Sequence, residues 1–554
     1  MSGNYRPRRR YGRAASANGT SANASEAGAD RGNAGKAGAG KRSAVAVRRD
    51  TARRASQPRR TAYDVLKAVR DREAYANLLL PKLLADRQLT GRDAALATEL
   101  AYGTLRGQGT YDAILTACSD RPLDKLDPPV LDILRLGAHQ LLNTRIGAHA
   151  AVATSVDLAK SVVGPRVSGY VNAVLRRVAT RDLDAWLDIV APSPTSDPIG
   201  SLATRYSHPR WIVAAYRAAL GDAADGPAQA TAIPDAPGAG AVTELEAALA
   251  AGNARPRVTM AAFPAGQSRD EIMPPGAEPG RWSPYAFTLQ SGDPAPLIDA
   301  GQAVVQDEGS QLAAMALSRA ALTPRPDQGS AEAERWLDMC AGPGGKSRLL
   351  YGLAQASRAT LTAAELHPHR AALVRDALIR ASRLTASAVP PASGDETGDL
   401  GRLAPPGTHG TEFEVVVADG TRPPWPDGTF DRVLVDAPCS GLGALRRRPE
   451  ARWRKSENDL TELTALQRDL LRSALKSVRP GGVVAYVTCS PVPAETSDVV
   501  ADVVASTPGA DILDAPGVLA DVPGTRAADA RFAQLWPHRH GTDAIFIALI
   551  RRGA

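Results

Sequence analysis

Two cysteines lie where a thiol could take part in chemistry. Cys439 belongs to the run DAPCSG at 436–441, and Cys489 belongs to the run TCSP at 488–491. Each cysteine comes directly after a candidate strand, and Asp436 ends the first of these strands. A lone free cysteine is more often a small buried residue than a nucleophile. Two on the same predicted ligand face, one of them close to an acid, instead favour covalent catalysis by a thiolate.

A glycine-rich turn, DMCAGPGGKS at 338–347, follows an earlier candidate strand. Its glycines would let the backbone approach a ligand closely, and the amides of the next helix favour negative charge such as a carboxylate. A Walker A loop would need glycine where Cys340 stands, and a dinucleotide-binding turn would need glycine or alanine where Ser347 stands. The pattern therefore predicts a nucleoside-type cofactor held without a phosphate-binding loop.

Two acids end further candidate strands. Glu365 lies twenty-three positions after Gly342, near the spacing at which an acid binds ribose hydroxyls. Asp419 could accept a hydrogen bond from an exocyclic amine. Either acid alone could also be a helix cap or a solvated strand end. Together with the glycine-rich turn, these acids make three consecutive strands that end in candidate ligand-binding residues, which favours a cofactor site.

A basic segment, RRRPEARWRK at 446–455, follows the Asp436 run. It has six basic residues against one acid, with a tryptophan among them. Such a segment could bind nucleic-acid phosphates and stack a base, each stacking contact contributing ~1–3 kcal/mol. A solvated basic loop is the alternative. The RNA-binding candidates are Arg446, Arg447, Arg448, Arg452, Trp453 and Arg454.

Short β-rich runs alternate with amphipathic helices from residue 304 to the end. This alternation predicts an α/β, Rossmann-like, parallel doubly wound sheet, which binds ligands at the carboxyl ends of its strands. One of the helices is expected at 459–478. We expect strands at 335–339, 359–364, 413–418, 431–436, 482–488 and 543–549.

The chain before this sheet domain is organised differently. From about Thr61, apolar residues recur at three- and four-residue spacing, which predicts an all-helical domain over 61–190. A linker and a small α/β subdomain are expected over 200–303, and the sheet domain covers 304–554.

Charge and cysteine content narrow the class of protein. The 554 residues carry a net charge of +7, and residues 1–60 contribute +12, from fifteen Lys and Arg against three acids. Few large apolar residues occur there, so we predict a disordered basic arm suited to polyanions, with a solubilising tail as the alternative. Four widely spaced cysteines suggest no zinc site or disulfide framework, and no apolar run approaches the ~18 residues of a membrane span. We expect no metal, no membrane contact and a reducing cytoplasm.

These motifs together resemble a known family. The cysteine runs, with AGPGGK at 341–346 and VQDEGSQ at 305–311, are similar to the signatures of SAM-dependent RNA cytosine-C5 methyltransferases, in the RsmB (Sun/Fmu) branch that acts on 16S rRNA. The resemblance extends from about residue 60 to 551. Three runs are similar to the NusB-like RNA-binding domain of that branch: LAYGTLR at 100–106, ILRLG at 133–137 and VNAVLRR at 171–177.

The resemblance implies a role for each polar residue of the site. Cys489 would be the nucleophile that adds to carbon 6 of a cytosine, and Cys439 would help eliminate the enzyme after transfer. Asp436 would hydrogen-bond the base at N3 and the amino group, and Lys346 would help hold this cluster. S-adenosylmethionine (SAM) would be bound by Cys340, Ala341, Gly342, Pro343, Gly344, Gly345, Lys346, Glu365, Arg370, Asp419 and Asp436.

The resemblance also implies a partner, 16S rRNA, and we expect a monomeric enzyme. Residue 365 is Glu where the family usually has Asp, a longer carboxylate that should still reach the ribose. Another RNA, such as tRNA or 23S rRNA, is an alternative substrate. DNA is a further alternative, because Pro438-Cys439 matches the dipeptide that carries the nucleophile of DNA cytosine-C5 methyltransferases, but this would leave Cys489 idle. The helical domain alone would fit a non-catalytic RNA-binding or antitermination module.

Overall fold

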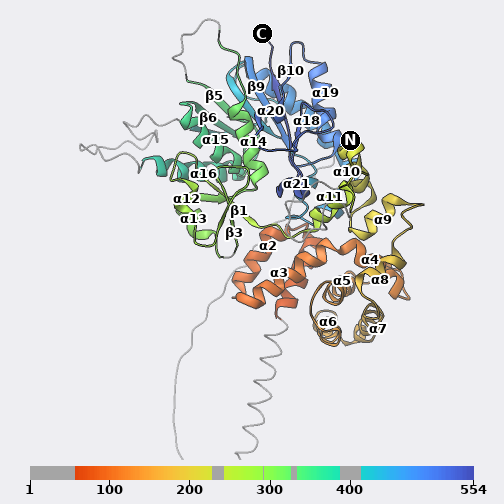
Figure 1. Cartoon of the computed structure of the whole chain (residues 1–554). Helices are drawn as coiled ribbons and strands as arrows, with labels where there is room; N and C mark the ends of the chain where they lie inside the picture. Colours follow the sequence, from red (N-terminus) through yellow and green to blue (C-terminus); the bar gives the residue numbers. More distant parts are fainter. Residues whose placement is uncertain (1–56, 228–241, 291, 326–332, 387–412, 554) are drawn as a thin grey trace, which may run out of the picture. The chain divides into compact units, whose positions relative to one another are not determined.

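The computed structural model describes residues 57–227, 242–290, 292–325, 333–386 and 413–553 (Figure 1). The predicted basic arm lies outside the described residues, apart from 57–60, which are helical. Within the described ranges, no helix is both long and apolar enough to cross a membrane.

The first part of the described chain is helical, as predicted (Figure 1). A helix over 57–72 is followed by α-helices whose apolar faces meet in one core. The central helix is α5 (Pro128–Asn143), which packs against α3, α4, α6 and α7 and buries Ile133 and Leu134 completely. Apolar residues at helical spacing therefore form the predicted bundle. The others are α2 (Ala76–Asp86), α3 (Gly91–Arg106), α4 (Gln108–Cys118), α6 (Ala148–Val162), α7 (Ser168–Val178) and α8 (Leu183–Val190).

Three further helices pack against the C-terminal half of the chain. They share an apolar cluster with Leu442, Leu445 and Trp536. These helices therefore pack against the segment that follows the Cys439 run. They are α9 (Pro198–Arg205), α10 (Arg210–Leu220) and α11 (Glu244–Asn253).

A small antiparallel sheet, of order β2-β3-β1-β4, lies in the predicted α/β subdomain. Its own core contains Met260 and Phe287, both fully buried. The last strand ends two residues beyond the predicted limit of 303. The strands are β1 (Val258–Ala262), β2 (Glu278–Pro279), β3 (Ala286–Leu289) and β4 (Ala303–Val305).

An eight-stranded sheet carries the C-terminal half. Its order is β10-β12-β9-β8-β5-β6-β7, and β11 pairs with β12. Two short strands were not predicted, β10 (Asp511–Ile512) and β11 (Ala533–Gln534). The six predicted strands are all present, as β5 (Arg335–Asp338), β6 (Thr360–Glu365), β7 (Phe413–Val417), β8 (Phe430–Asp436), β9 (Val478–Thr488) and β12 (Phe546–Arg551).

Helices cover both faces of this sheet because the strand residues point alternately to each face. Along β9, Val483 and Ala485 join the cluster of α14, α15 and α16, whereas Val484 and Tyr486 join the cluster of α18 and α19. The first strand, β5, lies between β8 and β6, so the strand order reverses at its carboxyl end, where such sheets bind ligands. The helices are α14 (Glu308–Arg319), α15 (Gly345–Ala356), α16 (Pro368–Ala386), α18 (Glu457–Ser477) and α19 (Ser497–Ala505).

One feature of the predicted sheet is wrong. We expected parallel strands, but β12 runs antiparallel to β9. Its residues from Phe546 to Ile550 are all buried, and a strand buried on both faces is a continuous apolar run in either direction. The sequence pattern therefore located this strand without giving its direction.

Candidate active site

Both cysteine runs follow the carboxyl ends of neighbouring strands in the large sheet. β8 and β9 are parallel neighbours with Asp436 beside Val487, so the turns that follow them start side by side. The N–H of Ala437 donates to the carbonyl of Val487 at 2.9 Å, which continues this pairing beyond β8. The Sγ atoms of Cys439 and Cys489 are 3.3 Å apart. The structure thus brings the two predicted catalytic cysteines into one site.

The contact between the cysteines makes the two thiols different. The pKa of Cys489 is lowered, first because Cys439 donates a hydrogen bond to it; burial and the negative charge of Asp436 oppose this effect, and the positive charge of Lys346 assists it. The pKa of Cys439 is raised well above its ordinary value by the same hydrogen bond, then by burial and by negative charge on Cys489 and Glu495. Cys489 is therefore the thiol that ionises first, and the thiolate is the nucleophilic form.

Lys346 and Asp436 form an ion pair beside the thiols. Nζ of Lys346 donates to Oδ2 of Asp436 at 2.7 Å. Lys346 is the second residue of α15, which follows β5, and Asp436 ends the neighbouring strand β8. Burial disfavours the charged lysine, but the charge of Asp436 and its hydrogen bond outweigh burial, so the pKa of Lys346 is raised. The ammonium group therefore stays charged and can stabilise a Cys489 thiolate.

The glycine-rich turn is held by Glu365 and Arg370. The N–H of Gly342 donates to Oε2 of Glu365 at 3.1 Å, and Arg370 donates to the carbonyl of Gly342 at 2.6 Å. A Cβ on Gly342 would lie 2.2 Å from Glu365 Oε2, so no larger residue fits without a shift. Gly344 has a φ of 107°, in the left-handed region that favours glycine. The turn leads into α15, whose first amides have no partner within the helix.

Two predicted cofactor residues, Asp419 and Cys340, have other interactions within the protein. Oδ1 of Asp419 accepts hydrogen bonds from the N–H and the hydroxyl of Thr421, at 3.0 and 2.7 Å. These bonds lower the pKa of Asp419 and give it the alternative role of stabilising its own turn. Burial raises the pKa of Cys340, so this thiol stays neutral. Contact of either residue with a cofactor stays a prediction.

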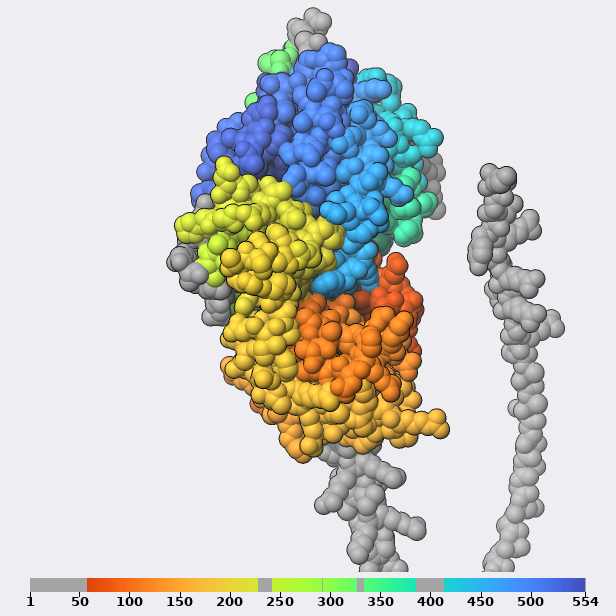
Figure 2. Space-filling view, turned by 90° about the vertical axis from the view of Figure 1, so that its right-hand side faces the viewer, coloured from red at the N-terminus to blue at the C-terminus, as the bar shows by residue number. Residues whose placement is uncertain are grey.

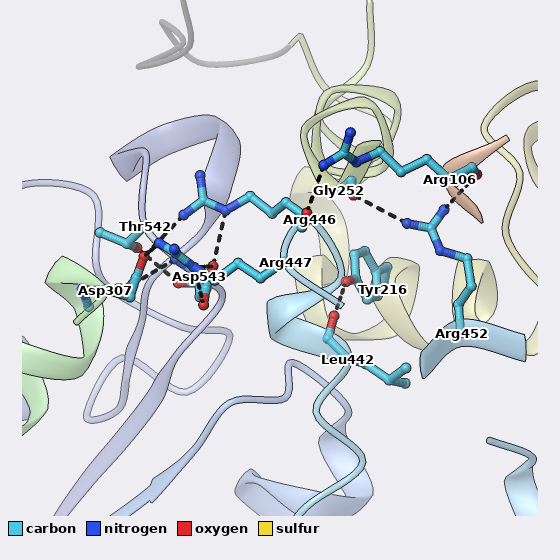
Figure 3. Close-up of polar contacts among 11 residues, drawn as sticks. Arg106, Tyr216, Gly252, Asp307, Leu442, Arg446, Arg447, Arg452, Thr542 and Asp543 are labelled. Atoms are coloured by element: carbon cyan, nitrogen blue, oxygen red, sulfur yellow. Dashed lines mark hydrogen bonds and ion pairs between the residues drawn. The ribbon is translucent and has the colours of Figure 1, made fainter. Parts of the chain in front are cut away.

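Three arginines of the basic segment, Arg446, Arg447 and Arg452, bind groups of the protein itself, contrary to their predicted role (Figure 3). Arg446 and Arg447 each form ion pairs with both Asp307 and Asp543. Burial disfavours the charge on Asp307, but the two arginines outweigh it and its pKa is lowered. Arg446 is only 5% exposed. These two arginines therefore neutralise acids of their own chain instead of RNA phosphates.

Arg452 is also corrected by the structure, because its side chain is completely buried. It donates to the carbonyl of Ser207 at 2.9 Å, to the carbonyl of Gly252 at 3.2 Å and to the side-chain oxygen of Asn253 at 2.7 Å. Burial lowers the pKa of Arg452 to about 9. The guanidinium N–H groups donate to backbone and side-chain oxygens of the protein, so Arg452 cannot contact RNA in this structure.

Two more members of the segment contact the helical domain. Trp453 packs on Gly109, where a Cβ would lie 2.5 Å from the indole. Arg454 donates to the carbonyls of Val69, Glu73 and Ala74 at 3.2, 2.9 and 2.5 Å. Figure 2 shows the surface of the helical domain, in orange, next to blue surface of the C-terminal half.

Arg448 is the one arginine of the six candidates that is classed as exposed. Its guanidinium lies 5.4 Å from the ring centre of Tyr75, which is 49% exposed. Among the described residues, no acid forms an ion pair with Arg448. It therefore keeps the predicted role of a candidate RNA contact.

Three acids near the site were missed by the sequence analysis. Asp307 lies in the VQDEGSQ run, which was identified as a family signature, but the run did not indicate that Asp307 pairs with arginines. Asp543 and Glu495 carry no sequence signal that distinguishes them from solvated acids. The described residues contain no group of three or more His, Cys, Asp or Glu side chains that could hold a metal ion.

Two family models match the sequence. The model described as 16S rRNA methyltransferase RsmB/F matches residues 326–392 and 407–551, and the NusB family model matches residues 56–180. The ribosomal RNA small subunit methyltransferase B of Pseudomonas syringae pv. tomato is 30% identical over 503 residues, which cover 89% of this chain and 96% of that protein. The chain belongs to the RsmB/F family of 16S rRNA methyltransferases.

Other comparisons agree with membership of the RsmB/F family. The Mycobacterium tuberculosis protein Rv1407 is 45% identical over 509 residues, covering 91% of this chain and 98% of that protein. The crystal structure of PH0851 has the same fold, with a TM-score of 0.65 at 20% identity, and the match covers 89% of this chain and 98% of that chain. The protein is a SAM-dependent RNA methyltransferase with an N-terminal NusB domain.

The residues at the carboxyl edge of the sheet fit SAM. The buried carboxylate of Glu365 is followed by Leu366, which is 55% exposed and could cover an apolar ring such as adenine. At the end of β5, the fully buried Asp338 accepts a hydrogen bond from the hydroxyl of Ser347 at 2.7 Å, and burial raises the pKa of this acid to about 7. Because Ser347 lies in the first turn of α15, this hydrogen bond fixes the start of α15 beside the Gly342 turn. The turn, Glu365 and Arg370 would hold the cofactor.

Proposed function

We propose that this RsmB/F enzyme transfers a methyl group to carbon 5 of a cytosine in 16S rRNA through a covalent adduct on Cys489. The observation that carries the proposal is the 3.3 Å contact between the sulfurs of Cys439 and Cys489, beside the Lys346–Asp436 ion pair. The name that the relatives from two Pseudomonas species share, ribosomal RNA small subunit methyltransferase B, supports small-subunit rRNA as the substrate.

Nucleophilic attack by Cys489 activates the base. Carbon 5 of cytosine is a poor nucleophile until a group adds to carbon 6, so the Cys489 thiolate forms a bond from Sγ to carbon 6. The electrons of the 5,6 double bond move through the ring toward N3, which takes up a proton from water. The Asp436 carboxylate favours this flow by accepting hydrogen bonds from the amino group and from the protonated N3. The adduct has an enamine-like, nucleophilic carbon 5. SAM, when bound, supplies an electrophilic methyl group.

Cys439 completes the cycle in this proposal. When the Cys489 sulfur is bonded to carbon 6, its negative charge is gone, and that charge is one cause of the raised pKa of Cys439. Cys439 can then release its own proton to water, and the resulting thiolate acts as the base that takes the proton from carbon 5. The electrons of that C–H bond restore the 5,6 double bond, the bond between carbon 6 and Sγ breaks, and Cys489 leaves as a thiolate.

The RNA must present an unpaired cytosine to this edge. Proteins that read RNA sequence usually bind unpaired bases, and chemistry on a base requires that it leave its stack. We assign Arg448 and Tyr75 to RNA binding, because both side chains are exposed and the Arg448 guanidinium has no acid partner among the described residues. The NusB domain supplies further RNA-binding surface.

Bisulfite sequencing of 16S rRNA tests the proposal. A strain that lacks the protein should lose one cytosine methyl group, and the wild-type gene should restore it, whereas Cys489→Ala should not. If every methylated cytosine persists in the deletion strain, the proposed substrate is wrong.

The Cys439→Ala protein tests the assignment of the two thiols. This variant should accumulate a covalent complex with RNA, visible as a shifted band on a denaturing gel. A DNA-type mechanism would place the two defects the other way round, with the adduct accumulating in Cys489→Ala.

A further inference from the structure

Glu495 is a buried acid that the reaction above does not use. It ends the short helix η5 (Pro493–Glu495), six residues after Cys489, and has no exposed surface. Its Oε1 accepts hydrogen bonds from the N–H of Ser440 at 2.7 Å and from the amide of Gln467 at 3.2 Å. Its Oε2 accepts from the hydroxyls of Ser440 and Ser490 at 2.5 and 2.6 Å. Four donors therefore surround a carboxylate that has no basic partner among the described residues.

The two serines are direct neighbours of the two cysteines. Ser440 follows Cys439 in the turn after β8, and Ser490 follows Cys489 in the turn after β9. The serine hydroxyls are themselves 3.2 Å apart. One carboxylate thus connects the two turns that carry the thiols.

Glu495 is held in place by the elements around it. The hydroxyl of Tyr486, on β9, donates to the backbone carbonyl of Glu495 at 2.8 Å. Gln467, on α18, donates both to Glu495 and to the carbonyl of Pro438, the latter at 2.8 Å. A side chain fixed from a strand and from a helix can set the position of other groups.

We propose that Glu495 is a positioning residue: through Ser440 and Ser490 it holds the Cys439 and Cys489 turns in register, so that the two sulfurs meet. The inference rests on the proposed function of the two cysteines. Glu495 acts through the serines, because its carboxylate forms its hydrogen bonds with them and with Gln467.

The charge of Glu495 supports the same arrangement. After the hydrogen bond to Cys489 and burial, negative charges including Glu495 raise the pKa of Cys439. Because the pKa of Cys439 is raised and that of Cys489 is lowered, Cys439 is the thiol that keeps its proton. The acid favours one hydrogen-bond direction as well as one geometry.

Disulfide formation measures the meeting of the sulfurs without methyl transfer. Diamide takes two electrons and two protons from a pair of thiols, which become a disulfide, and is itself reduced to the hydrazine. In the full-length protein, peptide mass mapping follows the Cys439–Cys489 product. Glu495→Ala should slow its formation at least ~10-fold, because positional errors of about 1 Å strongly reduce such reactions. Glu495→Gln should stay within ~3-fold, because an amide can still accept from Ser440 N–H and donate to the hydroxyls.

Methyl transfer supplies the second readout. Glu495→Ala should lower kcat ~100-fold and leave KM for RNA and SAM within ~3-fold, because a positioning role affects the reacting geometry and not the binding of either substrate. Glu495→Gln should restore most of kcat. Asp431→Asn is a matched control: Asp431 is another buried acid, at the opposite end of β8, bonded to Arg325 and Arg479, and this change should alter neither readout.

The outcomes separate this inference from the proposed function. Unchanged diamide reactivity and unchanged kcat in Glu495→Ala would overturn the inference. If that variant does not fold, Ser440→Ala and Ser490→Ala, which each remove one hydroxyl, decide the question by the same two criteria. A wild-type protein that methylates no RNA, but whose disulfide formation is still slowed by Glu495→Ala, would refute the proposed function and leave the positioning role standing.

Discussion

The basic segment 446–455 follows the Cys439 turn in the chain, yet it uses its polar groups differently from the two turns that carry the cysteines. In the turns, hydrogen bonds bring two thiols together and leave both partly exposed at the sheet edge. In the basic segment, Arg446 and Arg452 are buried and bind acids and carbonyls of the protein. Position at a strand end thus predicted correctly which residues lie together, whereas a high density of charge did not predict exposure to solvent.

The largest effect is expected at the cysteine turns. Cys489→Ala should reduce methyl transfer by ~10³-fold or more, because the covalent route is lost. Its free energy of unfolding in urea should stay within about 1 kcal/mol of wild type, because a half-buried thiol contributes little packing. Single-turnover assays with labelled SAM measure the first quantity. Substantial methyl transfer by folded Cys489→Ala protein would contradict the catalytic role that separates the cysteine turns from the basic segment.

Arg452 should show the opposite behaviour. Arg452→Met leaves the carbonyls of Ser207 and Gly252 without this donor, so the free energy of unfolding should fall by about 2–4 kcal/mol. RNA affinity of the folded variant should be unchanged. Arg448→Met, at an exposed position, is the control and should change stability by less than about 0.5 kcal/mol. Loss of RNA affinity without loss of stability in Arg452→Met would contradict the structural role.

The pH dependence of thiol alkylation sharpens the difference between the two cysteines. Because the pKa of Cys489 is lowered, its reaction with iodoacetamide should persist below the pH at which ordinary thiols react, and should decline as pH falls through that pKa. Cys439, whose pKa is raised, should react only at higher pH. Lys346→Met removes a cation that assists ionisation of Cys489 and should slow its alkylation several-fold at neutral pH. Equal profiles for both thiols would count against this ordering.

The smallest effect is expected at Arg448. Arg448→Ala should weaken RNA binding ~3-fold and reduce the slope of log affinity against log salt by about one unit, the signature of one lost phosphate contact. Arg526→Ala, at an arginine paired with Asp514, is the control and should change neither. Fluorescence anisotropy at several salt concentrations measures both quantities.

The sequence carried most of the fold because apolar spacing is a local signal. The helical bundle and six strands of the large sheet could be located from three- and four-residue or alternating patterns. The direction of β12 could not, since pairing with β9 depends on residues far along the chain. The strand ends also brought Cys439, Cys489, Asp436 and Lys346 together, because parallel neighbours end at one edge.

Partners that are distant in sequence could not be read from local patterns. Arg446 and Arg447 are neutralised by Asp307 and Asp543, which lie 139 residues before and 97 residues after Arg446. Glu495 is close to Cys489 in sequence, but the positioning role proposed for it depends on Ser440 and Gln467, which other elements supply. A run of charged residues therefore suggests that their side chains are exposed to solvent, but only the tertiary structure shows whether they are.

The contacts of the basic segment with the helical domain affect how the chain could be divided. Glu450 accepts a hydrogen bond from the N–H of Ala76, the first residue of α2, at 3.1 Å, and the indole of Trp453 rests on Gly109. A catalytic fragment made without residues 57–190 would expose that indole and leave the Arg454 donors without their carbonyl partners. Such a fragment should be poorly soluble alone and recover when co-expressed with the missing helices.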